Sequence, residues 1–157
     1  MKLILNRDIL FLIDRAKEKV KESDVYKDIC KEYKAKSYYI DNVAVVFSPD
    51  LDVSARTDGG VIYINAKYIE DIDETAHYIV HEFTHWCQQC LGDGPTYSPD
   101  SDDYLADDNE LEGFKNQVEF IKENEDYTGA KDYVDKLLDH HDVDGKEREE
   151  YEKKLGV

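Results

Sequence analysis

Two histidines lie four residues apart in the segment His81-Glu82-Phe83-Thr84-His85. On a helix, residues at this spacing project from one face, so both imidazoles can reach one metal ion. Neutral imidazole is a good zinc ligand, and two of them leave room for a third protein ligand and a water molecule. Glu82 follows the first histidine, where its carboxylate could accept a proton from the metal-bound water. The segment therefore predicts a zinc site that activates water for hydrolysis.

The residues around this pair predict a helix over about 73–91 with two unlike faces. One face is apolar and carries Ala76, Ile79, Val80, Phe83, Trp86, Cys87 and Cys90. The other carries His77, His81, Thr84, His85 and Gln88. The face opposite an apolar one is usually charged and solvated, whereas this one is nearly free of Lys, Arg and Asp. The pattern favours a metal site over solvated surface histidines. His77 could support that site, line its cleft or take no part in it.

A third ligand must come from another segment, because the Gly and third His of a metzincin extension are absent after His85. The segment 109–114 offers two carboxylates, Glu110 and Glu112. The buried face of its helix is defined by Leu111, Phe114, Val118 and Ile121. Glu110 lies at the edge of this face and Glu112 points away from it. Glu110 is therefore the predicted ligand, and Glu112 is the alternative.

The histidine pair, with a glutamate on a following helix, resembles the gluzincin branch of zinc metallopeptidases, in particular the minimal zincin-like metallopeptidases of phages and prokaryotes. The resemblance covers about residues 37–121, and residues 110–117 are similar to a Glu-x-Glu-small-aromatic-x-x-Gln segment of those proteins. It implies a zincin-like fold, in which a small antiparallel sheet packs on the active-site helix. The strand that ends at Asn65 resembles the edge strand that pairs with an extended peptide. The candidate substrate-binding residues are accordingly Val61, Ile62, Tyr63 and Ile64.

One position departs from the gluzincin pattern. Many gluzincins have an Asp four residues after the glutamate ligand, where it braces a histidine, but position 114 is Phe in this chain. Metal-binding histidines need such a partner to fix the orientation of the ring. Another group must therefore provide this support.

Hydrophobic periodicity and turn residues predict the elements that position the site. We expect a helix over about 7–22 with Asn6 as its N-cap, and a second helix that starts at Ser23-Asp24. Three strands form an antiparallel sheet within about 37–65, and the first of them includes Tyr38-Tyr39-Ile40. After the helix at about 73–91, an acidic loop runs to about Asp108. Further helices are expected over about 109–124, 130–140 and 145–155.

This order of elements predicts an α+β fold and a single zincin-like domain over residues 1–157. It comprises N-terminal helices over about 1–36, a sheet over about 37–65, the active-site helix over about 73–91 and C-terminal helices over about 109–155.

The composition narrows the possible partners. The formal net charge of −17 disfavours nucleic acids and anionic membrane surfaces, because it would repel their phosphates. A neutral or basic partner, or a divalent cation, fits better. The apolar runs near the start are too short and too charged for a secretory or membrane segment. Three cysteines do not form a disulfide framework, which favours a reducing cytoplasm, and the pair Cys87 and Cys90 reads as packed thiols.

These observations predict a zinc metallopeptidase whose substrate is a peptide or protein. Zn²⁺ would be held by His81, His85 and Glu110, with Glu82 as general base and then general acid. One alternative is a zinc-holding binding module without turnover on the same scaffold. Another is an acidic inhibitor or DNA mimic, in which the histidines are incidental.

Overall fold

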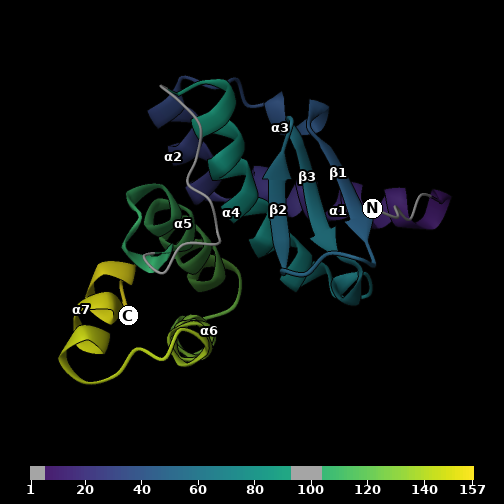
Figure 1. Cartoon of the computed structure of the whole chain (residues 1–157). Coiled ribbons are helices and arrows are strands. Elements are labelled where there is room, and N and C mark those ends of the chain that lie inside the picture. Colours follow the sequence, from purple (N-terminus) through teal and green to yellow (C-terminus); the bar gives the residue numbers. More distant parts are fainter. Residues whose placement is uncertain (1–5, 93–103) are drawn as a thin grey trace.

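The computed structural model describes residues 6–92 and 104–157, and this part of the chain has an α+β fold. The N-terminal half comprises α1 (Arg7–Glu22), α2 (Asp24–Tyr33), α3 (Tyr39–Asn42), β1 (Ala44–Ser48), β2 (Ala55–Asp58), β3 (Val61–Asn65) and a 3₁₀ turn (Ala66–Tyr68). The rest comprises α4 (Ile72–Cys90), a 3₁₀ turn (Tyr104–Ala106), α5 (Asp108–Asn124), α6 (Tyr127–His140) and α7 (Gly145–Leu155). Helix α4 lies between the sheet and α5 (Figure 1).

Polar caps set several of the helix boundaries that the sequence predicts. The side chain of Asn6 accepts a hydrogen bond from the backbone N–H of Ile9, which confirms it as the N-cap of α1. Ser23 ends α1 and caps α2 by accepting from the N–H of Tyr26. A short side-chain acceptor at the first turn satisfies a backbone donor that the helix leaves unpaired.

The sheet is mixed, so the prediction of an antiparallel sheet was wrong. Its order is β1-β3-β2, with β1 parallel to β3 and β2 antiparallel to β3. Gly59 and Gly60 both have positive φ and form the two-residue turn between β2 and β3. Ile62 and Ile64 of β3 are fully buried, whereas β2 carries polar residues of intermediate exposure. The apolar strand β3 therefore occupies the centre of the sheet, between β1 and β2, which both precede it in the chain.

The segment Tyr38-Tyr39-Ile40 was also predicted wrongly. It leads into the helical turn α3, and Ile40 is fully buried from that turn. A short run of aromatic and β-branched residues does not distinguish a strand from a buried helical turn. The predicted strand at Val61 and the helices at 7–22 and 145–155 are confirmed.

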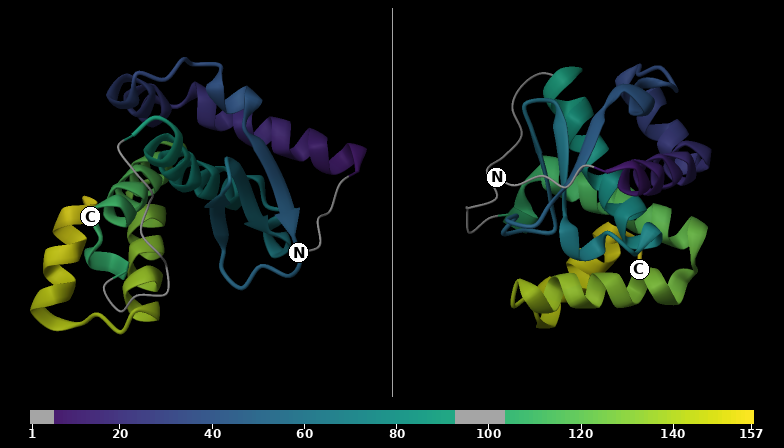
Figure 2. Two further views of the ribbon diagram at one scale, coloured as in Figure 1. Left: turned by 45° about the horizontal axis from the view of Figure 1, so that its top comes forward. Right: turned by 90° about the vertical axis from the view of Figure 1, so that its right-hand side faces the viewer.

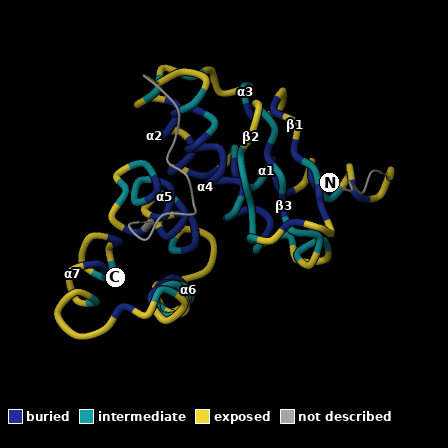
Figure 3. Tube along the Cα trace, viewed as in Figure 1, coloured by how far each residue is buried: buried dark blue, intermediate teal, exposed yellow. Residues whose placement is uncertain are grey.

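The buried apolar residues form two clusters. The first joins α1, α2 and the sheet to the apolar face of α4, and includes Ile13, Ile64 and Phe83. The second joins α5, α6 and α7, and includes Val118 and Leu155. Most of α4 is buried, as Figure 3 shows, because α1 and the sheet cover its apolar face and α5 packs on the other side. The polar face of α4 is thereby enclosed in the interior.

The cysteines differ in their surroundings. Cys87 is buried in the first apolar cluster, as predicted, but Cys90 at the end of α4 is exposed, so the prediction that both thiols are packed was wrong. All three cysteines are free thiols. Within the described ranges, no helix combines the length and the apolarity needed to cross a membrane.

Candidate metal centre

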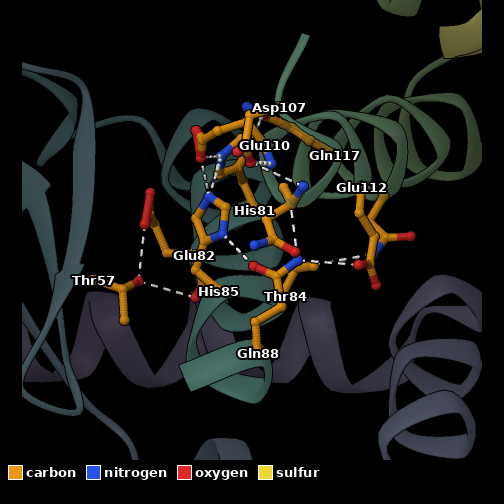
Figure 4. Close-up of polar contacts among 12 residues, drawn as sticks. Thr57, His81, Glu82, Thr84, His85, Gln88, Asp107, Glu110, Glu112 and Gln117 are labelled. Atoms are coloured by element: carbon orange, nitrogen blue, oxygen red, sulfur yellow. Dashed lines mark hydrogen bonds and ion pairs between the residues drawn. The ribbon is translucent and has the colours of Figure 1, made fainter. Parts of the chain in front are cut away.

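Helix α4 brings the two predicted histidines to the interface with α5. Asp71 caps the helix by accepting from the N–H of Glu74. His81 and His85 follow one turn apart, and each is about 5% exposed or less. The apolar face of α4 meets the sheet, so the histidine face points to α5 (Figure 4).

Glu110 reaches the histidine pair from the first turn of α5. The Nε2 atoms of His81 and His85 are 3.0 Å apart, and Oε1 of Glu110 lies 3.6 Å from Nε2 of His81 and closer still to Nε2 of His85. Asp107 holds this turn by accepting from the N–H groups of Asn109 and Glu110. The structure therefore brings together the three residues predicted as ligands, as a buried group that could hold a metal ion.

Glu112, the alternative ligand, lies elsewhere. Tyr33 of α2 donates its hydroxyl to the Glu112 carboxylate, at 2.7 and 2.8 Å from the two oxygens. The side-chain amide of Gln88 donates to Oε2 of the same carboxylate at 3.0 Å. Burial and these contacts with Glu112 raise the pKa of the Tyr33 hydroxyl above its usual range. Glu112 therefore anchors side chains around the centre and does not join the ligand group.

Two glutamine side chains take the place of the bracing Asp that is absent at Phe114. Nδ1 of His81 lies 3.0 Å from Oε1 of Gln117, and Nδ1 of His85 lies 2.7 Å from Oε1 of Gln88. Because an amide oxygen only accepts, both rings carry their proton on Nδ1. Both Nε2 lone pairs then point into the centre. One signal for Gln117 is its position seven residues after Glu110, which places it on the same helix face.

The ligand atoms of His81, His85 and Glu110 fit a divalent cation. Two Nε2 atoms and a carboxylate converge, and Oε2 of Glu110 is buried without a hydrogen-bond partner in the described part of the chain. Tetrahedral zinc, with bonds of about 2.0–2.1 Å, separates its ligand atoms by about 3.3 Å. The distances of 3.0 and 3.6 Å from Nε2 of His81 bracket this value, whereas Oε1 of Glu110 and Nε2 of His85 lie closer together than that. A cation between these atoms would attract all three of them.

Gly113 allows α5 to approach the His81 ring. A Cβ atom at this position would lie 3.0 Å from Cε1 and Nε2 of His81, which is tighter than nine in ten real Cβ contacts. The ring is bounded on another side by Phe114, whose centroid is 4.6 Å away in an edge-on arrangement. The small and aromatic residues after Glu112 therefore shape the space for this imidazole.

Glu82 lies on the side of the centre that faces the sheet. It is 5% exposed, and its Oε2 accepts a hydrogen bond of 2.8 Å from the hydroxyl of Thr57 on β2 (Figure 4). A cleft of about 890 Å³ opens beside it, and its lining includes Ser54, Ala55, His81, Glu82, Phe114 and Tyr133. The cleft therefore gives access to one predicted ligand and to the predicted general base.

The strand beside this cleft is β2, so the expectation that Val61, Ile62, Tyr63 and Ile64 form an edge strand was wrong. These residues belong to β3, which is hydrogen-bonded on both sides, to β1 and to β2. A central strand has no backbone groups left for an added peptide. Figure 1 shows β3 between β2 and β1, and Figure 2 shows the same sheet from two further sides. The resemblance placed this strand at the edge, although its apolar residues indicate burial, and burial favours the centre of a sheet.

Burial and the neighbouring charges shift the pKa values of His85 and Glu110 in opposite directions. Burial lowers the pKa of His85, but the hydrogen bond to Glu110 and the charges of Glu82 and Glu110 outweigh it and raise the pKa to about 9. Burial raises the pKa of Glu110, but the hydrogen bonds with His81 and His85 outweigh it and hold the pKa far below its usual range. In the absence of metal, a proton therefore stays between His85 and Glu110 at neutral pH.

We expect the metal-free protein to lose stability as the pH rises from about 6.5 to about 9. A group whose pKa is higher in the folded state stabilises the fold fully below its unfolded pKa, and this contribution is lost as the pH rises through the folded pKa. For Glu110 the sign is reversed, so its contribution is lost as the pH falls through its lowered pKa. Urea unfolding with a chelator across this range would measure the effect. A free energy of unfolding that rises with pH there would contradict it.

Comparisons of this chain with protein-family models, with curated proteins and with solved structures found no match. The centre itself and the cleft that reaches it are therefore what indicates a function.

Proposed function

We propose that this protein is a zinc-dependent peptidase with a zincin-like fold of the gluzincin type. The observation that carries the proposal is the convergence of His81, His85 and Glu110, whose ligand atoms all lie within 4.8 Å of one another. Glu82, next to the first ligand and on the cleft, supports a hydrolytic role. A site that served structure alone would have four protein ligands and no access from solvent.

The donor set favours zinc over other divalent cations. Two imidazole nitrogens and one carboxylate oxygen form a three-ligand set, which is typical of catalytic zinc, whereas magnesium and calcium prefer oxygen ligands. His81, His85 and Glu110 would hold the ion. When bound, zinc supplies a Lewis acid that lowers the pKa of a water molecule and polarises a carbonyl.

Glu82 would move the proton during hydrolysis. Its carboxylate accepts a proton from the attacking water and then returns it to the leaving amine. The Thr57 hydroxyl holds Oε2 of this carboxylate at 2.8 Å, which fixes the side chain toward the cleft. The same hydroxyl lies 3.0 Å from the Glu82 backbone oxygen, so β2 is tied to α4 at the residue that moves the proton.

The edge of β2 that faces away from β3 would take the substrate in place of the strand first expected. The backbone oxygen of Ser54 accepts from the N–H of Asn65, so Ser54 faces β3. Backbone groups alternate in direction along a strand, and the N–H and C=O of Ala55 therefore point away from β3. Ala55 also lines the cleft. An extended peptide that paired with Ala55 would run past Glu82 and the metal ligands.

Cleavage of a peptide library tests this function. We expect the zinc-loaded protein to cleave internal or terminal peptide bonds, and we expect a chelator to abolish the activity until zinc is restored. Substitution of Ala55 by Pro, which removes its N–H, should raise the KM for extended peptides more than it changes zinc content. Tight zinc binding without cleavage of any library member would overturn the peptidase and favour the alternative of a zinc-holding module.

A further inference from the structure

A row of polar side chains runs from His81 away from the metal ligands. Oε1 of Gln117 lies 3.0 Å from Nδ1 of His81, and Nε2 of Gln117 lies 2.6 Å from Nδ1 of His77. Nε2 of His77 in turn lies 3.0 Å from Oε2 of Glu74. His77 and Gln117 are buried, whereas the Glu74 side chain is 40% exposed and lines the cleft. The row therefore connects a metal ligand to the cleft wall.

The carboxylate at the outer end fixes the order of the protons along this row. An ionised carboxylate only accepts hydrogen bonds, so His77 must donate from Nε2 to Glu74. Neutral His77 then has a lone pair on Nδ1, which accepts from the amide of Gln117. This places the amide oxygen of Gln117 toward His81, which donates from Nδ1. The hydrogen bond from His77 lowers the pKa of Glu74, which keeps it ionised at neutral pH.

We propose that Glu74 is a positioning residue that selects the tautomer through which His81 binds the metal. With respect to metal binding, this inference rests on the proposed function. If the row were reversed, His77 would donate from Nδ1 to Gln117, and the Gln117 amide would donate to Nδ1 of His81. The proton of His81 would then sit on Nε2, the atom that faces Glu110 and His85. Such an imidazole cannot bind a metal through Nε2.

The orientation of the other histidine ligand, His85, does not depend on a second histidine. The Gln88 amide, which braces His85, donates to the backbone oxygen of Asn109 at 3.2 Å and to the Glu112 carboxylate at 3.0 Å. Both of these partners are obligate acceptors, so they orient Gln88 directly. Gln117 instead donates to His77, a ring that can present either a donor or an acceptor at Nδ1. The orientation at His81 is therefore set one residue further out, at Glu74.

Zinc affinity of Glu74 variants tests the proposal. We expect Glu74→Ala to weaken zinc binding by about 10–100-fold, as removal of outer hydrogen-bond partners of metal ligands typically does. Glu74→Gln retains an oxygen acceptor, so its zinc affinity should fall less than that of Glu74→Ala. Asp73→Asn is the matched control, because Asp73 lies in the same first turn of α4 and contacts Lys19 instead of the row. Equal affinity of Glu74→Ala and Asp73→Asn would overturn the proposal.

The tautomer of His77 provides a second test of the proposal that does not depend on zinc binding. In ¹⁵N spectra of the metal-free protein near pH 8, we expect the proton of His77 on Nε2 in the wild type, and a shift toward Nδ1 in Glu74→Ala. A wild-type His77 protonated on Nδ1 would overturn the proposal even if zinc binds. If the wild type bound no zinc, the proposed function would fail, and the spectrum would still decide the order of protons. Circular dichroism of each variant distinguishes these outcomes from a loss of fold.

Discussion

Replacement of Glu82 by Gln is expected to lower the rate of peptide hydrolysis by about 10²–10⁴-fold while zinc binding stays as in the wild type. The amide has nearly the shape of the carboxylate and can still accept the hydrogen bond that Thr57 donates. It cannot take a proton from water, so the loss isolates proton transfer. Measurement of kcat/KM together with zinc content checks this expectation.

Thr57→Val is the companion variant for this experiment. It removes the hydroxyl that holds Oε2 of Glu82 and leaves the carboxylate in place. We therefore expect a smaller loss of hydrolysis rate than for Glu82→Gln. An activity of Glu82→Gln within about tenfold of the wild type would remove Glu82 from the role of general base.

Replacement of Glu110 by Gln should reduce zinc affinity by more than about 100-fold, because outer partners of metal ligands alone account for about 10–100-fold. Glu110 contacts both histidines, and its second oxygen has no hydrogen-bond partner among the described residues, which suits a ligand. Chelator competition would measure the affinity. The variant should fold, since an amide in this position no longer requires a compensating positive charge.

Glu112→Gln is the matched control for that variant, two residues further along the same helix and with the same change in charge. Its carboxylate accepts from Tyr33 and Gln88, so we expect a weaker effect that reaches zinc only through the orientation of Gln88. If Glu112→Gln lost more zinc than Glu110→Gln, the assignment of the third ligand would have to be exchanged.

The sequence predicted best what depends on local periodicity. His81 and His85 are adjacent on one face because a helix has 3.6 residues per turn, and the apolar residues of α4 place that face inside. Glu110 followed from the same reasoning on a second helix, because its position relative to Phe114 and Ile121 directs it inward. Neither step required knowledge of how the two helices pack.

Features that depend on long-range packing could not be predicted. The sheet order places β3 between two strands that precede it, and the apolar pattern of β3 indicates burial without specifying its neighbours. The contacts of Thr57 with Glu82 and of Gln117 with His81 join residues 25 and 36 positions apart. Many hydroxyl and amide side chains along a sequence could make the same hydrogen bond. The actual partner becomes evident only when the helices and strands are placed in space. The expected acidic loop falls largely at 93–103, outside the described residues.

Elemental analysis after gentle purification asks whether the three side chains hold a zinc ion at all. We predict about one zinc per wild-type chain, as expected for a single three-ligand site, and almost none in His81→Ala purified in the same way. A wild type that retains no zinc, or a His81→Ala variant that retains as much as the wild type, would contradict the metal centre and the hydrolase that depends on it.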